Sequence, residues 1–323
     1  MHAFDFAAPA RTDEALRLAA GPGSAFLAGG TTLVDLLKLD VLTPQHVIDI
    51  NDLPLRGIRG GHDGLHIGAL ERMGDVARHR AVPPVVSRAL LQSASPQLRN
   101  MATIGGNLLQ RTRCGYFRDV TTPCNRREPG SGCPAQTGQN RAHAILGTSS
   151  NCVATHPSDL AVALVALDAS VRLVSRAGGR RSVRLADFYR IPGATPHVEN
   201  DLRSGELITE VVVPRLGWAR RSTYVKVRDR MSYEFALASA AVALDLRGGR
   251  VRDARVAVGG VATVPWRLPG VEAALRGGPA TEQAFTTATE AAAEGARPLA
   301  DNAFKVTLVR RTIARALMEA SGS

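Results

Sequence analysis

The spacing of apolar residues predicts alternating strands and helices over the first 50 residues. An apolar run at 25–28 is typical of a buried strand, and the pair Gly29-Gly30 interrupts it. A helix is expected over 33–39, a strand over 46–50, and an earlier helix over 12–20. Strand, glycine turn, helix and strand together form a βαβ unit.

The rest of the chain changes character twice. Helices are expected at 71–81 and 85–95, but from 103 to 155 no apolar periodicity persists, and Gly, Asn, Arg, Pro and Cys accumulate. A helix then follows Ser158 over 159–168, with strands at 170–175 and 206–214. Beyond Trp218 the strands are longer, at 222–228, 236–246 and 250–259, and a helix covers 306–320. Gly248-Gly249 joins the last two strands as a hairpin. We predict a domain boundary near residue 218.

Charge and composition narrow the class of protein. The net charge is +11, but all but three of the 40 basic residues are arginines, and they are spread along the whole chain. Because phosphate recognition needs clustered cations, we expect no nucleic-acid partner. No apolar run approaches the roughly 20 residues of a membrane span, and the first residues lack a basic and apolar leader. We expect no membrane span and either a cytoplasmic chain or export to the periplasm together with a partner.

Two glycine pairs have the chemistry of phosphate-binding loops. Ala28-Gly-Gly-Thr-Thr32 lies between a predicted strand and a predicted helix, and Thr103-Ile-Gly-Gly-Asn107 repeats paired glycines between polar side chains. Glycine allows the backbone to approach a ligand closely, and free N–H groups at a helix start attract anions. Either loop alone could be an ordinary turn. Two of them together predict a ligand bridged by pyrophosphate, such as a dinucleotide.

These loops, followed by Pro157-Ser-Asp-Leu160, resemble the FAD-binding medium subunit of the xanthine dehydrogenase and carbon monoxide dehydrogenase family. The resemblance covers essentially the whole chain. It implies an α+β fold: a two-subdomain FAD-binding domain of the vanillyl-alcohol oxidase-like (PCMH) type, then a C-terminal α+β domain with a three-stranded antiparallel sheet and helices. The expected domains are 1–218, with subdomains 1–52 and 53–218, and 219–323.

The resemblance also implies which residues bind FAD. The first loop would surround the pyrophosphate through Leu27, Ala28, Gly29, Gly30, Thr31, Thr32, Leu33 and Val34. The second loop would contact the cofactor through Thr103, Ile104, Gly105, Gly106 and Asn107. Nearer the flavin ring the resemblance places Asp159, Ile208 and Lys226. Asp159 also suits the first turn of any helix, Ile208 any strand core, and Lys226 any surface.

The four cysteines, Cys114, Cys124, Cys133 and Cys152, all fall in the segment without periodicity. They are separated by nine, eight and eighteen residues, which matches neither common zinc pairs nor the compact ferredoxin motif. From spacing alone, an Fe–S cluster, a zinc ion and two disulfides all remain open. We expect His143 and His156, which flank this segment, to be structural.

The sequence around these cysteines resembles a smaller group, the flavin subunits of bacterial periplasmic aldehyde oxidoreductases. This resemblance implies that loop 108–155 holds a [4Fe-4S] cluster on the four cysteines. Nearby arginines would offset the charge of the cluster, namely Arg111, Arg113, Arg118, Arg126 and Arg127. No residue of this chain would be catalytic. The implied partners are a large subunit with a molybdenum–pterin (molybdopterin) centre, a small [2Fe-2S] subunit and an external electron acceptor.

The implied reaction is oxidation of an aldehyde to its carboxylic acid, with the substrate site on another chain. Two alternatives are kept. One is the flavin subunit of a xanthine or carbon monoxide dehydrogenase, which shares the fold. The other is a zinc-stapled nucleic-acid-binding protein, which would explain the cysteines and the basic charge but neither glycine loop.

Overall fold

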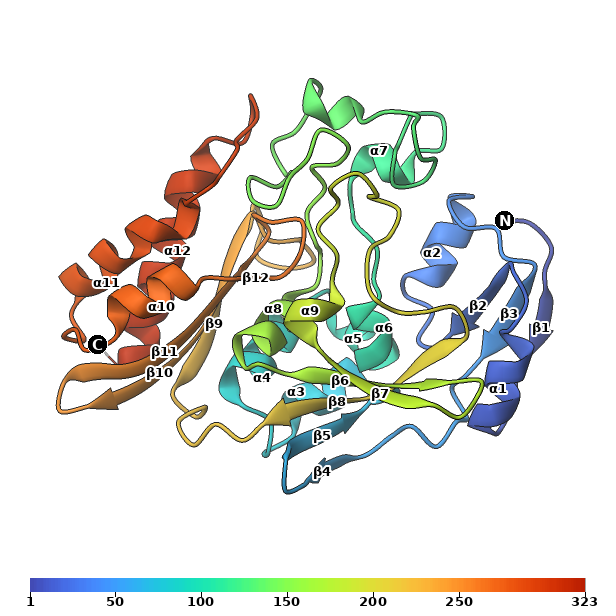
Figure 1. Cartoon of the computed structure of the whole chain (residues 1–323), viewed down its shortest axis with the longest axis horizontal. Helices are drawn as coiled ribbons and strands as arrows, with labels where there is room; N and C mark the ends of the chain where they lie inside the picture. The colour runs from blue at the N-terminus through green and yellow to red at the C-terminus, as the bar shows by residue number, and fades with distance from the viewer. Residues whose placement is uncertain (323) are drawn as a thin grey trace.

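A computed structural model describes residues 1–322 (Figure 1). Its N-terminal layer is a three-stranded parallel sheet in the order β1-β3-β2. The strands are β1 (Asp5–Ala7), β2 (Ser24–Leu27) and β3 (His46–Asp49), and the helices are α1 (Thr12–Leu18) and α2 (Leu33–Lys38). Strands β2 and β3, which precede and follow α2 in the sequence, pair in parallel. This pairing confirms the predicted βαβ unit. The buried side chains of α1 and β3 join one small core.

The middle of the chain forms a five-stranded antiparallel sheet in the order β4-β5-β8-β6-β7. Its strands are β4 (Ile58–Gly60), β5 (Gly64–Gly68), β6 (Ser170–Ser175), β7 (Arg180–Arg184) and β8 (Glu206–Pro214). Helices cover one face of it (Figure 1). They are α3 (Met73–Arg78), α4 (Pro84–Gln92), α5 (Pro96–Met101), α6 (Ile104–Leu108), α8 (Asp159–Ala166) and α9 (Leu185–Phe188).

The C-terminal part is a four-stranded antiparallel sheet in the order β12-β11-β10-β9. It contains β9 (Ser222–Val227), β10 (Ala238–Arg247), β11 (Arg250–Gly259) and β12 (Trp266–Arg267), with α10 (Pro269–Leu275), α11 (Glu282–Ala288), the 3-10 helix η2 (Thr289–Ala293) and α12 (Phe304–Ser321). Strand β10 is buried on both faces, because Ala241 and Ala243 pack with α8 while Val242 and Leu244 pack with α12. This double burial explains its almost continuous apolar sequence.

Helix α8 lies where the two larger sheets meet. All eight of its residues are buried, and it packs against α4, β10 and β11. Ser158 caps its first turn by accepting a hydrogen bond from the backbone N–H of Ala161 at 2.9 Å. An apolar helix buried on all sides therefore holds Asp159 deep in the molecule.

The cysteine-bearing loop connects distant parts of the chain. It contains the short helix α7 (Gly115–Arg118) and a 3-10 turn, η1 (Pro134–Gln136). Phe117 and Cys124 pack on Leu36 of α2. On its other side, Lys305 of α12 donates to the carbonyls of Ala142 and His143, each at 2.9 Å. The loop thus bridges the N-terminal sheet and the C-terminal helices (Figure 1).

The α+β class is confirmed, with differences in detail. The C-terminal sheet has a fourth strand of only two residues, too short to show an alternating pattern. The helix predicted over 71–81 begins at Met73, because Arg72 is still extended, and the helix predicted over 85–95 ends at Gln92, ahead of a left-handed residue at Ala94. The boundary near residue 218 stays a prediction. Among residues 1–322, no helix combines the length and the apolar character needed to cross a bilayer.

Candidate functional site

The two glycine loops meet at a single cavity of about 160 Å³. The first loop follows β2 and leads into α2, and the second loop is the start of α6. The first residues of the two loops, Ala28 and Thr103, are 75 residues apart in the sequence, yet both loops line the same cavity. The lining residues are Ala28, Gly29, Gly30, Thr31, Thr32, Leu33, Leu36, Leu42, Thr103, Gly106, Leu109 and Arg111.

Glycine is required in the first loop. A Cβ on Gly29 would lie 2.1 Å from the carbonyl oxygen of Met101, so the two loops can approach each other only without a side chain there. Gly30 has a φ of +71°, the left-handed region that other residues rarely adopt. Asn51 steadies the loop by donating to the carbonyl of Ala28 at 2.8 Å. At Gly29 and Gly30 the loop therefore presents backbone without side chains.

Some residues of the second loop line the cavity, and the others hold the loop in place. Thr103 and Gly106 line the cavity, and the Thr103 hydroxyl accepts from the backbone N–H of Gly106 at 3.2 Å. Ile104 is buried in the core, and Gly105 donates its N–H to the carbonyl of Ala69. Asn107 accepts a hydrogen bond from the Ser158 hydroxyl at 2.6 Å, which ties α6 to α8.

Asp159 and Lys226 form a buried ion pair with an N–O distance of 2.7 Å. The Asp159 carboxylate also accepts from the Tyr224 hydroxyl at 2.7 Å and from the Ser93 hydroxyl at 3.0 Å. The Lys226 ammonium also donates to the carbonyl of Gln92 at 3.2 Å. Of this pair, only Asp159 reaches a cavity, a small one of about 30 Å³.

Ile208 lies in the core between the five-stranded sheet and its helices, with 2% of its surface exposed. Neither Ile208 nor Lys226 lines the glycine-loop cavity, the cysteine cavity or the cavity at Asp159. The structure thus brings the glycine loops together but places these two residues behind the cavity walls.

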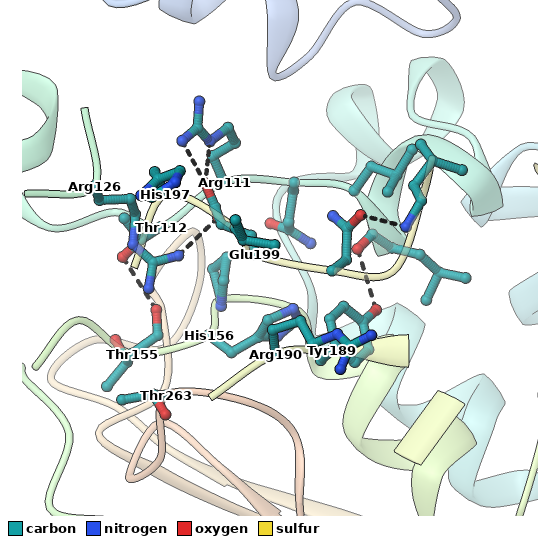
Figure 2. A pocket seen from close by; sticks show the side chains of 17 residues that line it. Arg111, Thr112, Arg126, Thr155, His156, Tyr189, Arg190, His197, Glu199 and Thr263 are labelled. Atoms are coloured by element: carbon teal, nitrogen blue, oxygen red, sulfur yellow. Dashed lines mark hydrogen bonds and ion pairs between the residues drawn. The ribbon is translucent and has the colours of Figure 1, made fainter. Parts of the chain in front are cut away.

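A second cavity, of about 390 Å³, adjoins the first (Figure 2). The two cavities share Leu109 and Arg111. On its far side lie His156 and Tyr189, whose rings meet edge to face with centroids 4.5 Å apart. Burial, together with the charge of Arg126, lowers the pKa of His156 to about 3, so this imidazole is neutral. A structural role for His156 stays a prediction.

Two arginines share one carboxylate in the wall of this second cavity (Figure 2). Arg126 bonds to Glu199 through Nη1 and Oε2 at 2.8 Å, and Arg111 pairs with the other oxygen of Glu199. The sequence suggested both arginines as counter-charges but gave no sign of Glu199. Glu199 is 88 residues from Arg111, so no local pattern could connect them.

The four cysteines line one small cavity, of about 10 Å³, beside this wall. All four are free thiols, and no disulfide joins them. Burial raises the pKa of Cys114 to about 12 and also raises that of Cys133, and in both cases Cys124 and Cys152 contribute to the rise. Arg126 lines this cavity too and donates to the sulfur of Cys152 at 3.5 Å.

His143 lies closer to the cysteines than expected, with Nε2 3.2 Å from the sulfur of Cys114. Its Nδ1 is buried without a hydrogen-bond partner, and burial lowers its pKa. Among residues 1–322, no group of three or more His, Cys, Asp or Glu side chains is arranged to hold a metal ion.

Comparison with known proteins agrees with this geometry. The family model described as "FAD binding domain in molybdopterin dehydrogenase" matches residues 2–216, and "CO dehydrogenase flavoprotein C-terminal domain" matches residues 222–320. The chain is 50% identical to the aldehyde oxidoreductase FAD-binding subunit PaoB of Escherichia coli, over 93% of this chain and 92% of that protein. It is 32% identical to the glyceraldehyde dehydrogenase medium chain of Sulfolobus acidocaldarius, over 76% of this chain and 71% of the other.

A solved structure gives the same result. A carbon monoxide dehydrogenase chain from Hydrogenophaga pseudoflava superposes with a TM-score of 0.76 at 27% identity, covering 99% of this chain and 98% of that one. The match extends over both the glycine-loop region and the C-terminal sheet. This chain therefore belongs to the FAD-binding medium subunits of the molybdenum hydroxylase family.

Proposed function

We propose that this chain is the FAD- and [4Fe-4S]-carrying electron-transfer subunit of a molybdenum-dependent aldehyde oxidoreductase. As a medium subunit it is part of a multi-subunit oxidoreductase that also has large and small subunits. The observation that carries the proposal is the position of two sites against one wall: the cavity at the glycine loops and the cavity lined by four thiols, connected by Arg111, Glu199 and Arg126.

The first cavity fits the pyrophosphate of FAD. A dianionic bridge needs backbone N–H donors at close range, and Gly29 and Gly30 provide an approach that no side chain obstructs. Thr103 and Gly106 face the same space from the second loop. Leu27 to Val34 would surround the phosphates, while Ile104, Gly105 and Asn107 would hold the second loop in place. Once bound, the flavin supplies the electron chemistry.

The 390 Å³ cavity shares Leu109 and Arg111 with the glycine-loop cavity, and it shares His156 with the small cavity that Asp159 lines, so these spaces would receive the flavin side of the cofactor. Asp159 would contact it from the start of α8. Direct contacts from Ile208 and Lys226 remain predictions, since both residues lie behind the walls. Lys226 would act on the ring through Asp159, whose carboxylate it holds.

The set of four cysteine thiols around one cavity supports a [4Fe-4S] cluster over the other two ligands. Disulfides are disfavoured because all four thiols are free around one space. Zinc is disfavoured because the cysteines are nine, eight and eighteen residues apart and include none of the closely spaced pairs that common zinc sites use. A [4Fe-4S] cubane takes four thiolate ligands, and four cysteines face this one cavity. The arginines around the cavity would offset the negative charge.

The aldehyde substrate and the partner cofactors are inferred from the relatives. The protein at 50% identity is called an aldehyde oxidoreductase subunit, and the one at 32% a glyceraldehyde dehydrogenase subunit. We propose that a large subunit oxidises the aldehyde at a molybdenum–pterin centre and that a small [2Fe-2S] subunit passes the electrons here. An external acceptor would then receive them.

The carbon monoxide dehydrogenase medium chain of Hydrogenophaga pseudoflava, at 29% identity, supports the alternative reaction less strongly. Turnover assays of the assembled complex with aldehydes, purines and carbon monoxide separate these reactions. Absence of aldehyde oxidation would refute the proposed substrate.

The cofactor content is tested by an anaerobic visible spectrum of the purified chain, with iron and acid-labile sulfide counted per flavin. We expect flavin absorption over a broad iron–sulfur band and about four irons per flavin. Cys133→Ser should lose the iron, whereas Ser150→Ala, at an exposed serine of the same loop, should keep it. Flavin without iron would remove the cluster from the proposal and leave the family unchanged.

A further inference from the structure

Among the described residues, Arg126 is the one arginine that lines both the cysteine cavity and the 390 Å³ cavity. Figure 2 shows it in the wall of the larger cavity. Only 7% of its side chain is exposed. Its Nη2 lies 3.5 Å from the sulfur of Cys152, and its Nε is buried with no hydrogen-bond partner. A guanidinium is not deprotonated in proteins, so this buried side chain carries a positive charge.

Glu199 is the counter-ion of this buried charge. Its carboxylate is 18% exposed and pairs with Arg126 on one oxygen and with Arg111 on the other. Arg111 in turn lines the cavity at the glycine loops. Three charged groups thus form an unbroken row from the thiols to the loops where the flavin phosphates are proposed to bind.

We infer that Arg126 sets the reduction potential of the cluster held by the four cysteines, and that Glu199 limits its effect. This inference rests on the proposed function, because it needs the cluster. When the cluster takes up one electron, no bond forms or breaks, and one negative charge is added. A fixed cation with an N–H directed at a ligand sulfur stabilises that added charge, so it raises the potential.

The surroundings favour a large effect. Charges interact more strongly in a buried region than in water, and Arg126 is almost fully enclosed. Other arginines of the loop have other partners. Arg113 and Arg118 form ion pairs with Asp35, and Arg127 donates hydrogen bonds to backbone carbonyls. Only Arg126, among the arginines of the described chain, has a hydrogen bond to a cysteine sulfur.

A purely structural role predicts something different. If Arg126 only fastened the cysteine loop to the segment around Glu199, then Arg126→Gln and Glu199→Gln would break the same bond and have the same consequence. If Arg126 acts by its charge, the two substitutions have opposite signs. Arg126→Gln removes a positive charge and lowers the potential. Glu199→Gln removes the neutralising carboxylate and raises it.

The test uses the full complex with its cofactors. Iron and sulfide are counted first, and an anaerobic redox titration is then followed by electron paramagnetic resonance of the reduced cluster. At a fixed ambient potential we expect Arg126→Gln to lower the ratio of reduced to oxidised cluster at least tenfold, equal to 59 mV for a one-electron couple. Glu199→Gln should raise this ratio, and Arg126→Lys, which keeps the charge, should recover most of the loss.

Arg141→Gln is the matched control. It removes the same charge from the same loop, but Arg141 pairs with Asp229 at the surface and is 53% exposed. Its ratio should stay within about threefold of the unsubstituted complex, since solvent screens the charge.

The inference is overturned if both Arg126→Gln and Glu199→Gln keep their iron and shift the ratio in the same direction or not at all. Should Arg126→Gln lose its iron, Glu199→Gln and Arg126→Lys decide, and a Glu199→Gln ratio that does not rise overturns it. An unsubstituted complex without iron would overturn the inference together with the cluster, and the iron count shows that the cluster was the part that failed.

Discussion

The ion pair between Asp159 and Lys226 allows a direct test of whether these residues hold the protein together or only hold the cofactor. The Lys226 side chain is 1% exposed and that of Asp159 is 7% exposed. Lys226→Met preserves most of the aliphatic length but removes the ammonium. Asp159 would then keep only the hydroxyls of Tyr224 and Ser93 as donors for a buried negative charge.

Removing one partner of a buried pair costs about 3–5 kcal/mol, because the remaining charge is left without compensation. At roughly 2–4 °C per kcal/mol, the apparent Tm of the flavin-free chain should fall by about 10 °C. The double variant Asp159→Asn with Lys226→Met leaves no buried charge, so it should be much more stable than Lys226→Met alone.

The measurement is thermal and urea unfolding of the flavin-free chain, followed by circular dichroism. Lys38→Met is the matched control, because Lys38 is exposed on α2 and its loss should leave the Tm within about 1 °C. If Lys226→Met unfolds at the same temperature as the unsubstituted chain while flavin retention is lost, the pair is not structural. Lys226 would then serve the cofactor directly, and the reasoning from burial would be refuted.

Three further outcomes follow from single contacts. Gly29→Ala should release FAD and lower the free energy of unfolding by about 2 kcal/mol or more, because its Cβ would lie 2.1 Å from the Met101 carbonyl oxygen. Gly217→Ala is the control and should keep FAD, because a Cβ there has open space. Flavin retention on gel filtration checks both variants. Ser158→Ala should cost about 1 kcal/mol in urea unfolding through loss of the α8 cap. Burial, aided by the charge of Arg141, lowers the pKa of Lys305 to about 7. Between pH 7 and its ordinary value of 10.5 the unfolded chain binds the extra proton, so stability from Lys305 should rise with pH there. Lys305→Met should flatten this rise when unfolding free energies at pH 7 and pH 9.5 are compared.

Some parts of the fold could be predicted because they depend on neighbours in the sequence. The turn at Gly29-Gly30 follows from an apolar strand that ends in residues able to adopt unusual backbone angles, and the hairpin at Gly248-Gly249 follows from the same property. The cap at Ser158 is equally local. In contrast, β4 and β5 gave no usable pattern, since they are short and contain glycine, and β5 is stabilised by pairing with β8 about 145 residues later.

The site divides in the same way. The sequence by itself determined the chemical types: two glycine loops able to accept phosphates, and four cysteines confined to one irregular segment. Only the tertiary structure decided which of these residues face a shared space, because Thr103 and Gly106 line the cavity while Ile104 and Gly105 turn into the core. It also decided that Lys226 is committed to Asp159 and that Glu199 joins Arg126 to Arg111. The physical reason is that burial and charge pairing depend on contacts between residues far apart in the chain, and a sequence pattern records only what lies within a few residues.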